Sequence, residues 1–101
     1  VYKRQRLIIA RHHLPWCVSQ VGARTEFQFC STPPLNGTQA SAAMNPELEY
    51  AIHLFLLNRD VLITPFHNMM LVCPDTSQAD VQRLLAAFDA ALTALTGAPA
   101  P

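Results

Sequence analysis

The sequence lacks the short motifs by which many enzymes are recognised. Its 101 residues contain no GxSxG nucleophile turn, no P-loop, no GxGxxG segment after a strand and no HExxH zinc motif. The four histidines have no regular ligand spacing, so a metal site is a poor interpretation of them. We therefore predict no catalytic residue and no metal ligand in this chain.

Charge is scarce, and no long hydrophobic run occurs. Charged residues make up 14% of the chain, and seven Lys and Arg balance seven Asp and Glu, so no long-range field attracts a polyanion. The apolar runs, such as residues 54–57 and 69–73, are far shorter than the roughly 20 residues of a membrane-spanning helix. The run 7–10 is also shorter than a signal-peptide core of about 7–15 residues. We expect neither a nucleic-acid nor a membrane partner.

Cysteine is rare and odd in number. Cys17, Cys30 and Cys73 include no CxxC pair, which argues against a disulfide framework or a structural zinc site. The pattern favours reduced thiols in the cytosol, so we expect a cytoplasmic protein. The simplest interpretation of the three cysteines is buried, unreactive thiols.

Apolar material is plentiful, since half of the residues are hydrophobic. This is enough for one small core, and the length is too short for two domains. We predict a single domain over residues 1–96 and a disordered tail, residues 97–101. The opening VYKRQ resembles the translation of sequencing-adapter bases at the edge of a metagenomic fragment. Val1–Gln5 are therefore expected to be non-native, and the true protein to extend upstream.

The first half of the chain predicts a helix end, a strand pair and a loop. Residues 6–13 have no helix breaker before Pro15, so they read as the last turns of a helix. Apolar and polar residues alternate over residues 24–30, and we predict that this segment pairs with residues 16–21 in an antiparallel hairpin. Residues 31–44 are rich in Pro, Asn and small polar residues. They predict a long loop, either a lid or binding loop or a surface excursion.

The second half predicts two helices around two short strands. Asn45 and Pro46 are a typical start for a helix, which we expect to end near Asp60. Residues 61–63 and 69–72 are the predicted strands. A last helix follows, with a capping-box-like Ser77 and Asp80 at its start and an apolar face over Val81, Leu84, Leu85, Phe88, Leu92 and Leu95.

These elements predict an α+β fold, in which helices cover one face of a small, mainly antiparallel sheet. The opposite face would carry Arg24, Glu26 and Gln28. Such a face is either solvated or packed on something absent from this chain.

Three polar residues are candidate substrate-binding residues: Arg24, His67 and Asn68. His67 and Asn68 lie in a turn between apolar segments, and both side chains donate and accept hydrogen bonds. They either line a ligand site or brace the turn. Arg24 could hold a carboxylate through two parallel hydrogen bonds. Its alternative role is an ion pair with an acid such as Glu26 or one from a partner domain.

The segments LFLLNRDVLITPFHNMMLVCPDTSQADVQRLLAAF and PWCVSQVGARTEFQFCSTPPLNG resemble the C-terminal small domain of class III, fold-type I, pyridoxal-phosphate aminotransferases. They are most similar to the glutamate-1-semialdehyde aminomutase-like enzymes. The resemblance extends from about Arg6 to Leu95, and VLITPFHNMMLVCPDTSQADV is its most specific part. Asp60 and His13 stand where the family commonly has Gly. A left-handed backbone at these two positions would cost about 1 kcal/mol each.

The resemblance implies a parent transaminase or aminomutase. In that family a large N-terminal domain, missing here, holds pyridoxal 5'-phosphate on a lysine, and the small domain closes over a small amino-acid or keto-acid substrate, commonly in a homodimer. The one lysine of this chain is Lys3, within the suspect opening. We therefore expect the fragment to be inactive alone and to bind no pyridoxal phosphate. The alternative is a free-standing α+β module that binds a protein partner or a regulatory ligand.

Overall fold

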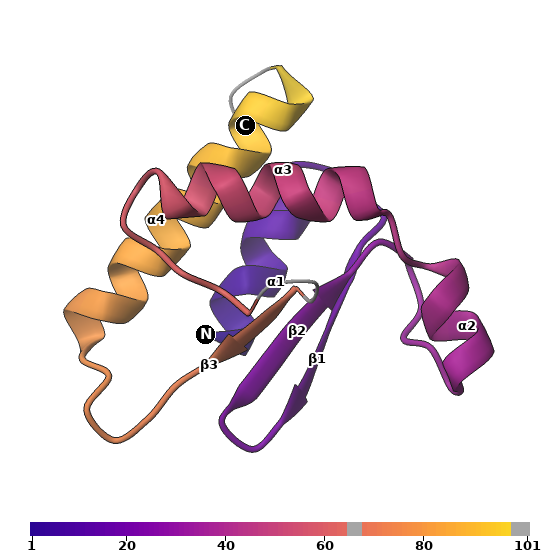
Figure 1. The fold of residues 1–101 in the computed structure, drawn as a ribbon, viewed down its shortest axis with the longest axis horizontal. Coiled ribbons are helices and arrows are strands. Elements are labelled where there is room, and N and C mark those ends of the chain that lie inside the picture. Colours follow the sequence, from indigo (N-terminus) through magenta and orange to yellow (C-terminus); the bar gives the residue numbers. More distant parts are fainter. Residues whose placement is uncertain (65–67, 98–101) are drawn as a thin grey trace.

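The computed structural model describes residues 1–64 and 68–97, and it confirms the α+β prediction. Three strands of this part of the chain form one antiparallel sheet in the order β1-β2-β3. Helices α1, α3 and α4 cover one face of the sheet, whereas α2 stands apart beyond the end of β2 (Figure 1). In chain order the elements are α1 (Tyr2–Arg11), β1 (Cys17–Val21), β2 (Arg24–Gln28), α2 (Gly37–Ala42), α3 (Pro46–Leu57), β3 (Met69–Leu71) and α4 (Gln78–Thr96).

The alternation predicted for the hairpin decides which side chains enter the core. Val18 pairs with Phe27, and Thr25 pairs with Met70. Residues directly opposite each other in a sheet point to the same face, and all four are buried beneath the helices. The tight turn between β1 and β2 uses Gly22 with φ +58°, a conformation that glycine adopts without steric cost.

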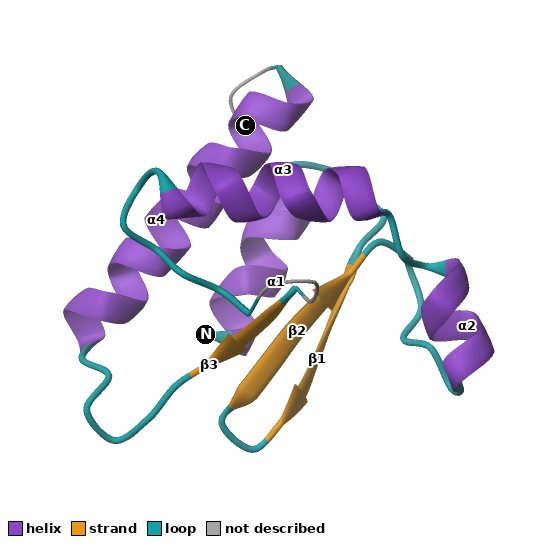
Figure 2. Cartoon of the chain, in the orientation of Figure 1, coloured by secondary structure: helices purple, strands orange, loops and turns teal. Residues whose placement is uncertain are grey.

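The helix layer closes the core over this face (Figure 2). The ring of Phe27 meets the ring of Phe88 from α4, with 5.0 Å between centroids. Ile52 and Leu56 of α3 are fully buried in the same cluster. In the predicted apolar face of α4, Leu85, Phe88 and Leu92 are buried and Leu95 is exposed, whereas Val81 and Leu84 are partly buried against the core.

Two side-chain hydrogen bonds to a carboxylate also connect the end of α1 to α4. Nε2 of His12 donates to Oδ1 of Asp89 at 2.7 Å, and Nη2 of Arg11 donates to Oδ2 of the same carboxylate at 3.0 Å. The side chain of His12 is almost fully buried. One carboxylate of α4 therefore holds the end of α1.

The predicted non-native opening is part of α1. The helix begins at Tyr2 and not at residue 6. The side chain of Gln5 is fully buried, and its Nε2 donates to Sδ of Met70 at 3.3 Å.

Two predicted elements are wrong. Residues 61–63 form no strand, because the N–H of Val61 donates to the carbonyl of Leu56 and closes the end of α3. Residues 31–44 are not a continuous loop, because Asn36 accepts a hydrogen bond from the N–H of Gln39 and begins the short helix α2. The Asn-Gly pair acts as a helix cap there and not as a turn.

The predicted helix ends are confirmed. Asn45 accepts from the N–H of Leu48 at the start of α3, and Ser77 with Asp80 forms a capping box at the start of α4. His13 has φ 56° and Asp60 has φ 64°. Both adopt the left-handed conformation in which a side chain is disfavoured by about 1 kcal/mol or more.

Candidate functional site

An open pocket with several polar side chains in its lining lies where β2 ends. Its volume is about 400 Å³, and it is lined by the end of β2, by α2 and by the first turn of α3. The polar side chains among the lining residues are Glu26, Gln28, Ser41, Glu49 and Asn68. The pocket therefore contains one of the predicted substrate-binding residues.

Asn68 is held firmly at this pocket. It is only 5% exposed, and its carbonyl accepts a hydrogen bond from the N–H of Phe27 at 3.1 Å. Its side-chain Oδ1 is buried and has no hydrogen-bond partner among residues 1–64 and 68–97. A buried acceptor without a partner is costly, and such groups occur at functional sites. Asn68 thus provides a fixed carbonyl oxygen that can accept a hydrogen bond.

Arg24 lies at the other end of β2, on the face away from the helices. Its Cα partners are Val21 and Leu71, whose side chains are 76% and 63% exposed. Arg24 is itself exposed. The two ion pairs found among residues 1–64 and 68–97 join Arg11 and His12 to Asp89 and do not involve Arg24.

The structure does not bring Arg24 and Asn68 into one pocket. Arg24 pairs with Leu71, whereas Asn68 precedes β3 and bonds to Phe27, three residues further along β2. The third candidate, His67, lies outside the described residues. In the described residues that flank this segment in the sequence, the N–H of Thr64 donates to the carbonyl of Met69 at 3.2 Å.

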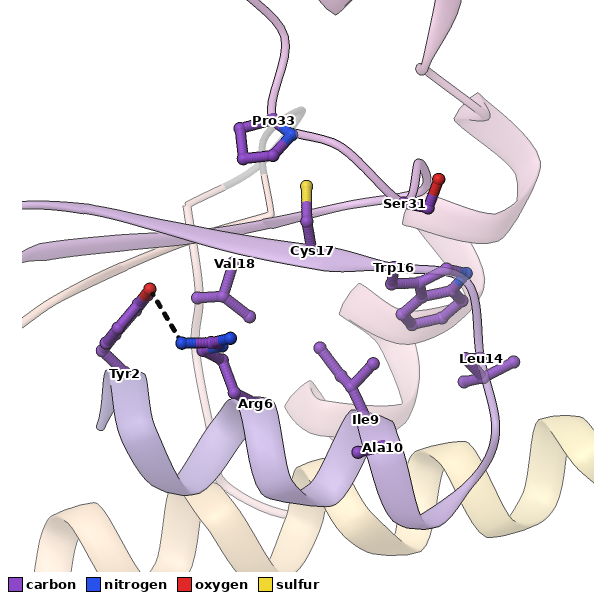
Figure 3. Close-up of a pocket in the computed structure, with 10 residues that line it drawn as sticks. All are labelled: Tyr2, Arg6, Ile9, Ala10, Leu14, Trp16, Cys17, Val18, Ser31 and Pro33. Carbon is purple, nitrogen blue, oxygen red and sulfur yellow. Dashed lines mark hydrogen bonds between the residues drawn. The ribbon is translucent and has the colours of Figure 1, made fainter.

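A second pocket, of about 310 Å³, lies between α1 and β1 (Figure 3). Nη1 of Arg6 points across it and donates to the hydroxyl of Tyr2 at 3.4 Å. Trp16 closes one side, with its ring 4.8 Å from that of Phe29. None of the predicted substrate-binding residues is among those that line this pocket. The sequence could not indicate it, because the contact between α1 and β1 depends on the tertiary fold.

The expectation of buried thiols is wrong for Cys73, which is exposed. A hydrogen bond from the Thr76 hydroxyl to Sγ lowers the pKa of Cys73. Cys17 is half-buried, and burial, together with the neighbouring Cys30, raises the pKa of Cys17 to about 11. Cys73 is therefore the more reactive of these two thiols.

Other kinds of site have no support in the described part of the chain. No three His, Cys, Asp or Glu side chains gather there in a group that could hold a metal ion. No helix there has the length and apolar character needed to cross a membrane.

Neither a protein-family model nor a curated protein sequence matches the chain. Solved structures do match. A glutamate-1-semialdehyde aminomutase from Pseudomonas aeruginosa PAO1 is 41% identical over 93% of this chain, with a TM-score of 0.91. A lysine-to-alanine variant of a glutamate-1-semialdehyde aminomutase from the same organism, in complex with PMP, is 42% identical over 90% of this chain, with a TM-score of 0.88.

A β-phenylalanine aminotransferase from Variovorax paradoxus is 20% identical over 99% of the chain, with a TM-score of 0.83, which shows a shared fold. The chain spans 21%, 20% and 23% of the lengths of these three proteins. The predicted resemblance is therefore confirmed: the chain matches about one fifth of an aminomutase or aminotransferase.

Proposed function

We propose that this chain is the C-terminal, substrate-capping domain of a pyridoxal-phosphate-dependent transaminase or aminomutase. The main support is the match to the Pseudomonas aminomutase, 41% identical with a TM-score of 0.91 over 93% of the chain. Because the chain spans about one fifth of that enzyme, the chemistry belongs to a parent that also has a large domain.

The residues present do not fit pyridoxal phosphate. The cofactor needs a lysine amine for its Schiff base, and the one lysine, Lys3, is exposed on α1 and lines neither pocket. The pocket at the end of β2 has Glu26 and Glu49 in its lining, and carboxylates repel a phosphate. The cofactor is therefore held by the missing part of the parent. When mixed with pyridoxal phosphate, the isolated chain should form no borohydride-reducible Schiff base that Lys3→Arg abolishes, beyond the non-specific reaction of exposed amines.

In this proposal Arg24 binds the carboxylate of a small amino-acid or keto-acid substrate. Arg24 is exposed, and it stands between two exposed apolar residues, Val21 and Leu71. An apolar surrounding strengthens a charged hydrogen bond by lowering the local dielectric constant. These features suit a planar cation that holds a carboxylate.

Asn68 and His67 are proposed to lie at the mouth of the active site. The support is the buried Oδ1 of Asn68, which lacks a hydrogen-bond partner. A donor group of the substrate, or of the large domain, would satisfy this oxygen. His67 follows from the sequence alone, as the neighbour of Asn68 in the same turn.

The parent is further proposed to be a cytoplasmic homodimer. The cellular location is proposed on cysteine usage, since three cysteines without CxxC spacing are typical of reduced thiols. The dimer follows only from the family resemblance. Sedimentation of the parent enzyme would measure its mass directly.

A chimera tests the proposed function. The matching fifth of the Pseudomonas aminomutase is replaced by residues 6–95 of this chain. We expect a soluble enzyme that binds pyridoxal phosphate and retains aminomutase or transaminase turnover. The matched control carries the same replacement with Arg24→Ala. A chimera that folds and binds the cofactor but has no turnover would contradict the capping role and favour a free-standing interaction module.

A further inference from the structure

Two of the three thiols are in direct contact. Sγ of Cys17 lies 3.8 Å from Sγ of Cys30. Cys17 begins β1, where its Cα partner is Gln28, and Cys30 follows Gln28 by two residues. The Cys17 sulfur points away from α1 and toward the segment that carries Pro33 (Figure 3). The sheet register therefore places the two sulfurs together across the hairpin.

The local backbone leaves room for the sulfurs to approach. A disulfide requires about 2.05 Å between sulfur atoms, so this pair would have to close by about 1.8 Å. Strand β2 ends at Gln28, and the chain bends over residues 29–32. Cys30 lies in this bend, where its thiol donates to the carbonyl of Thr32 at 3.2 Å. No ladder bond of the sheet has to break for Cys30 to move.

We propose that Cys17 and Cys30 are a redox modification site. The two cysteines form a reversible intramolecular disulfide by exchange with a low-molecular-weight disulfide, such as oxidised glutathione, which acts as the oxidant. One cysteine thiolate attacks the glutathione disulfide, forms a mixed disulfide and releases one glutathione thiolate. The second cysteine thiolate then attacks the protein sulfur of the mixed disulfide and releases the other glutathione. The two protein thiols are oxidised, and their two protons end on two molecules of glutathione.

The first attack falls to Cys30. The pKa of Cys17, raised to about 11, leaves very little thiolate on that residue at neutral pH, and the thiolate is the nucleophile. Cys17 then reacts within the chain, where the close sulfur of Cys30 gives it a high effective concentration. The rate of closure should therefore increase with pH.

Cys73 is excluded from the pair by the sheet. It follows β3, and β1 and β3 lie on opposite sides of β2, about two strand spacings, or roughly 9.5 Å, apart. Cys73 is exposed, and its pKa is lowered, so it is the thiol most easily modified by external reagents.

Formation of the disulfide between Cys17 and Cys30 would restrict the path of the chain toward α2. Residues 31–36 connect Cys30 to α2, and α2 forms one wall of the pocket at the end of β2. A covalent link from Cys30 to β1 would anchor this connection at its first residue. The proposal concerns the thiol chemistry alone and does not depend on the function proposed above.

The test uses the 101-residue chain with Cys73→Ser, so that only the proposed pair remains. The reduced protein is mixed with oxidised glutathione, and free thiols are titrated over time, once in buffer and once in concentrated urea. We expect both thiols to be lost together and a product lighter by two hydrogens. Closure in buffer should be at least about tenfold faster than in urea, because only the folded chain holds the sulfurs together.

Cys17→Ser in the same background is the matched control, and it should stop at a mixed disulfide between Cys30 and glutathione. Peptide mapping of the wild-type chain, oxidised in the same way, gives the linkage independently of the Cys73 substitution and should show Cys17 joined to Cys30. Equal rates in buffer and urea, a persistent glutathione adduct on the pair, or links between chains only would each overturn the proposal.

Discussion

The two faces of the sheet are made from the same three strands but have different surroundings. On the inner face, Val18, Phe27 and Met70 are buried under α1, α3 and α4. On the outer face, Val21 and Leu71 are mostly exposed on either side of Arg24. The inner face is explained by the stability of this chain alone. The outer face is not, because exposed apolar side chains beside a cation contribute little to folding.

The largest effect should come from Phe27→Ala on the inner face. Phe27 is fully buried, and its ring contacts those of Trp16, Phe29 and Phe88. Loss of a buried aromatic ring leaves a cavity and costs about 3–5 kcal/mol. Denaturant unfolding of the isolated chain measures this. The outer-face control Leu71→Ala should change the free energy of unfolding by less than about 0.5 kcal/mol. Equal losses of unfolding free energy in the two variants would contradict the difference proposed between the two faces of the sheet.

A smaller effect is expected for Arg24→Ala on the outer face, and it should fall on the parent enzyme and not on folding. If Arg24 holds a substrate carboxylate, its loss should cost about 1–3 kcal/mol of transition-state binding. The value of kcat/KM should then fall roughly 5- to 150-fold. The free energy of unfolding of the isolated chain should stay within about 0.5 kcal/mol. Arg24→Lys keeps the charge but loses the two-pronged geometry, so it should restore part of the activity. A lower Tm with unchanged kinetics would assign Arg24 to folding.

Asp60→Gly should stabilise the chain slightly. Asp60 has φ 64°, and removal of its side chain relieves the strain of that conformation, by up to about 1 kcal/mol. The matched control is Asn58→Gly, two residues earlier in a right-handed conformation with φ −67°, which should not stabilise. Thermal unfolding of both variants checks the sign. Stabilisation by both glycines would show that relief of the left-handed strain at Asp60 is not the cause.

The smallest effect is a pH dependence at the start of α4. The N–H and hydroxyl of Ser77 lower the pKa of Asp80. A carboxyl whose pKa is lower in the folded state stabilises that state above its unfolded pKa, and the contribution is lost as pH falls through the folded pKa. The free energy of unfolding should thus decrease on acidification below about pH 4. Asp80→Asn should reduce this decrease, and an identical acid profile would exclude the capping carboxylate as its source.

Local signals in the sequence were reliable. The caps at Asn45 and Ser77 and the helix end at Asp60 were predicted correctly. Each depends on interactions within a few residues, and residue type limits those interactions strongly. The left-handed backbone at His13 was anticipated only from the family resemblance, in which Gly is common at that position. The buried alternation of β2 was also correct, because one face of a strand must meet the core.

Several features were missed, and most of them are non-local. The exception is the hydrogen bond from the N–H of Val61 to Leu56, which is local, but no composition rule distinguishes it from strand pairing. The contact between Cys17 and Cys30 depends on the hairpin register and on the bend after Gln28. The unpartnered oxygen of Asn68 becomes visible only when every neighbour is in place. The sequence could therefore nominate Asn68 but could not show what is unusual about it.

The shared carboxylate of Asp89 has a mechanical consequence. Because Arg11 and His12 both donate to it, the first and last helices cannot slide past each other without losing two hydrogen bonds at once. In the proposed parent, the large domain would connect through the first helix. A rotation of the first helix would therefore carry the last helix with it, and the domain would move as a rigid body.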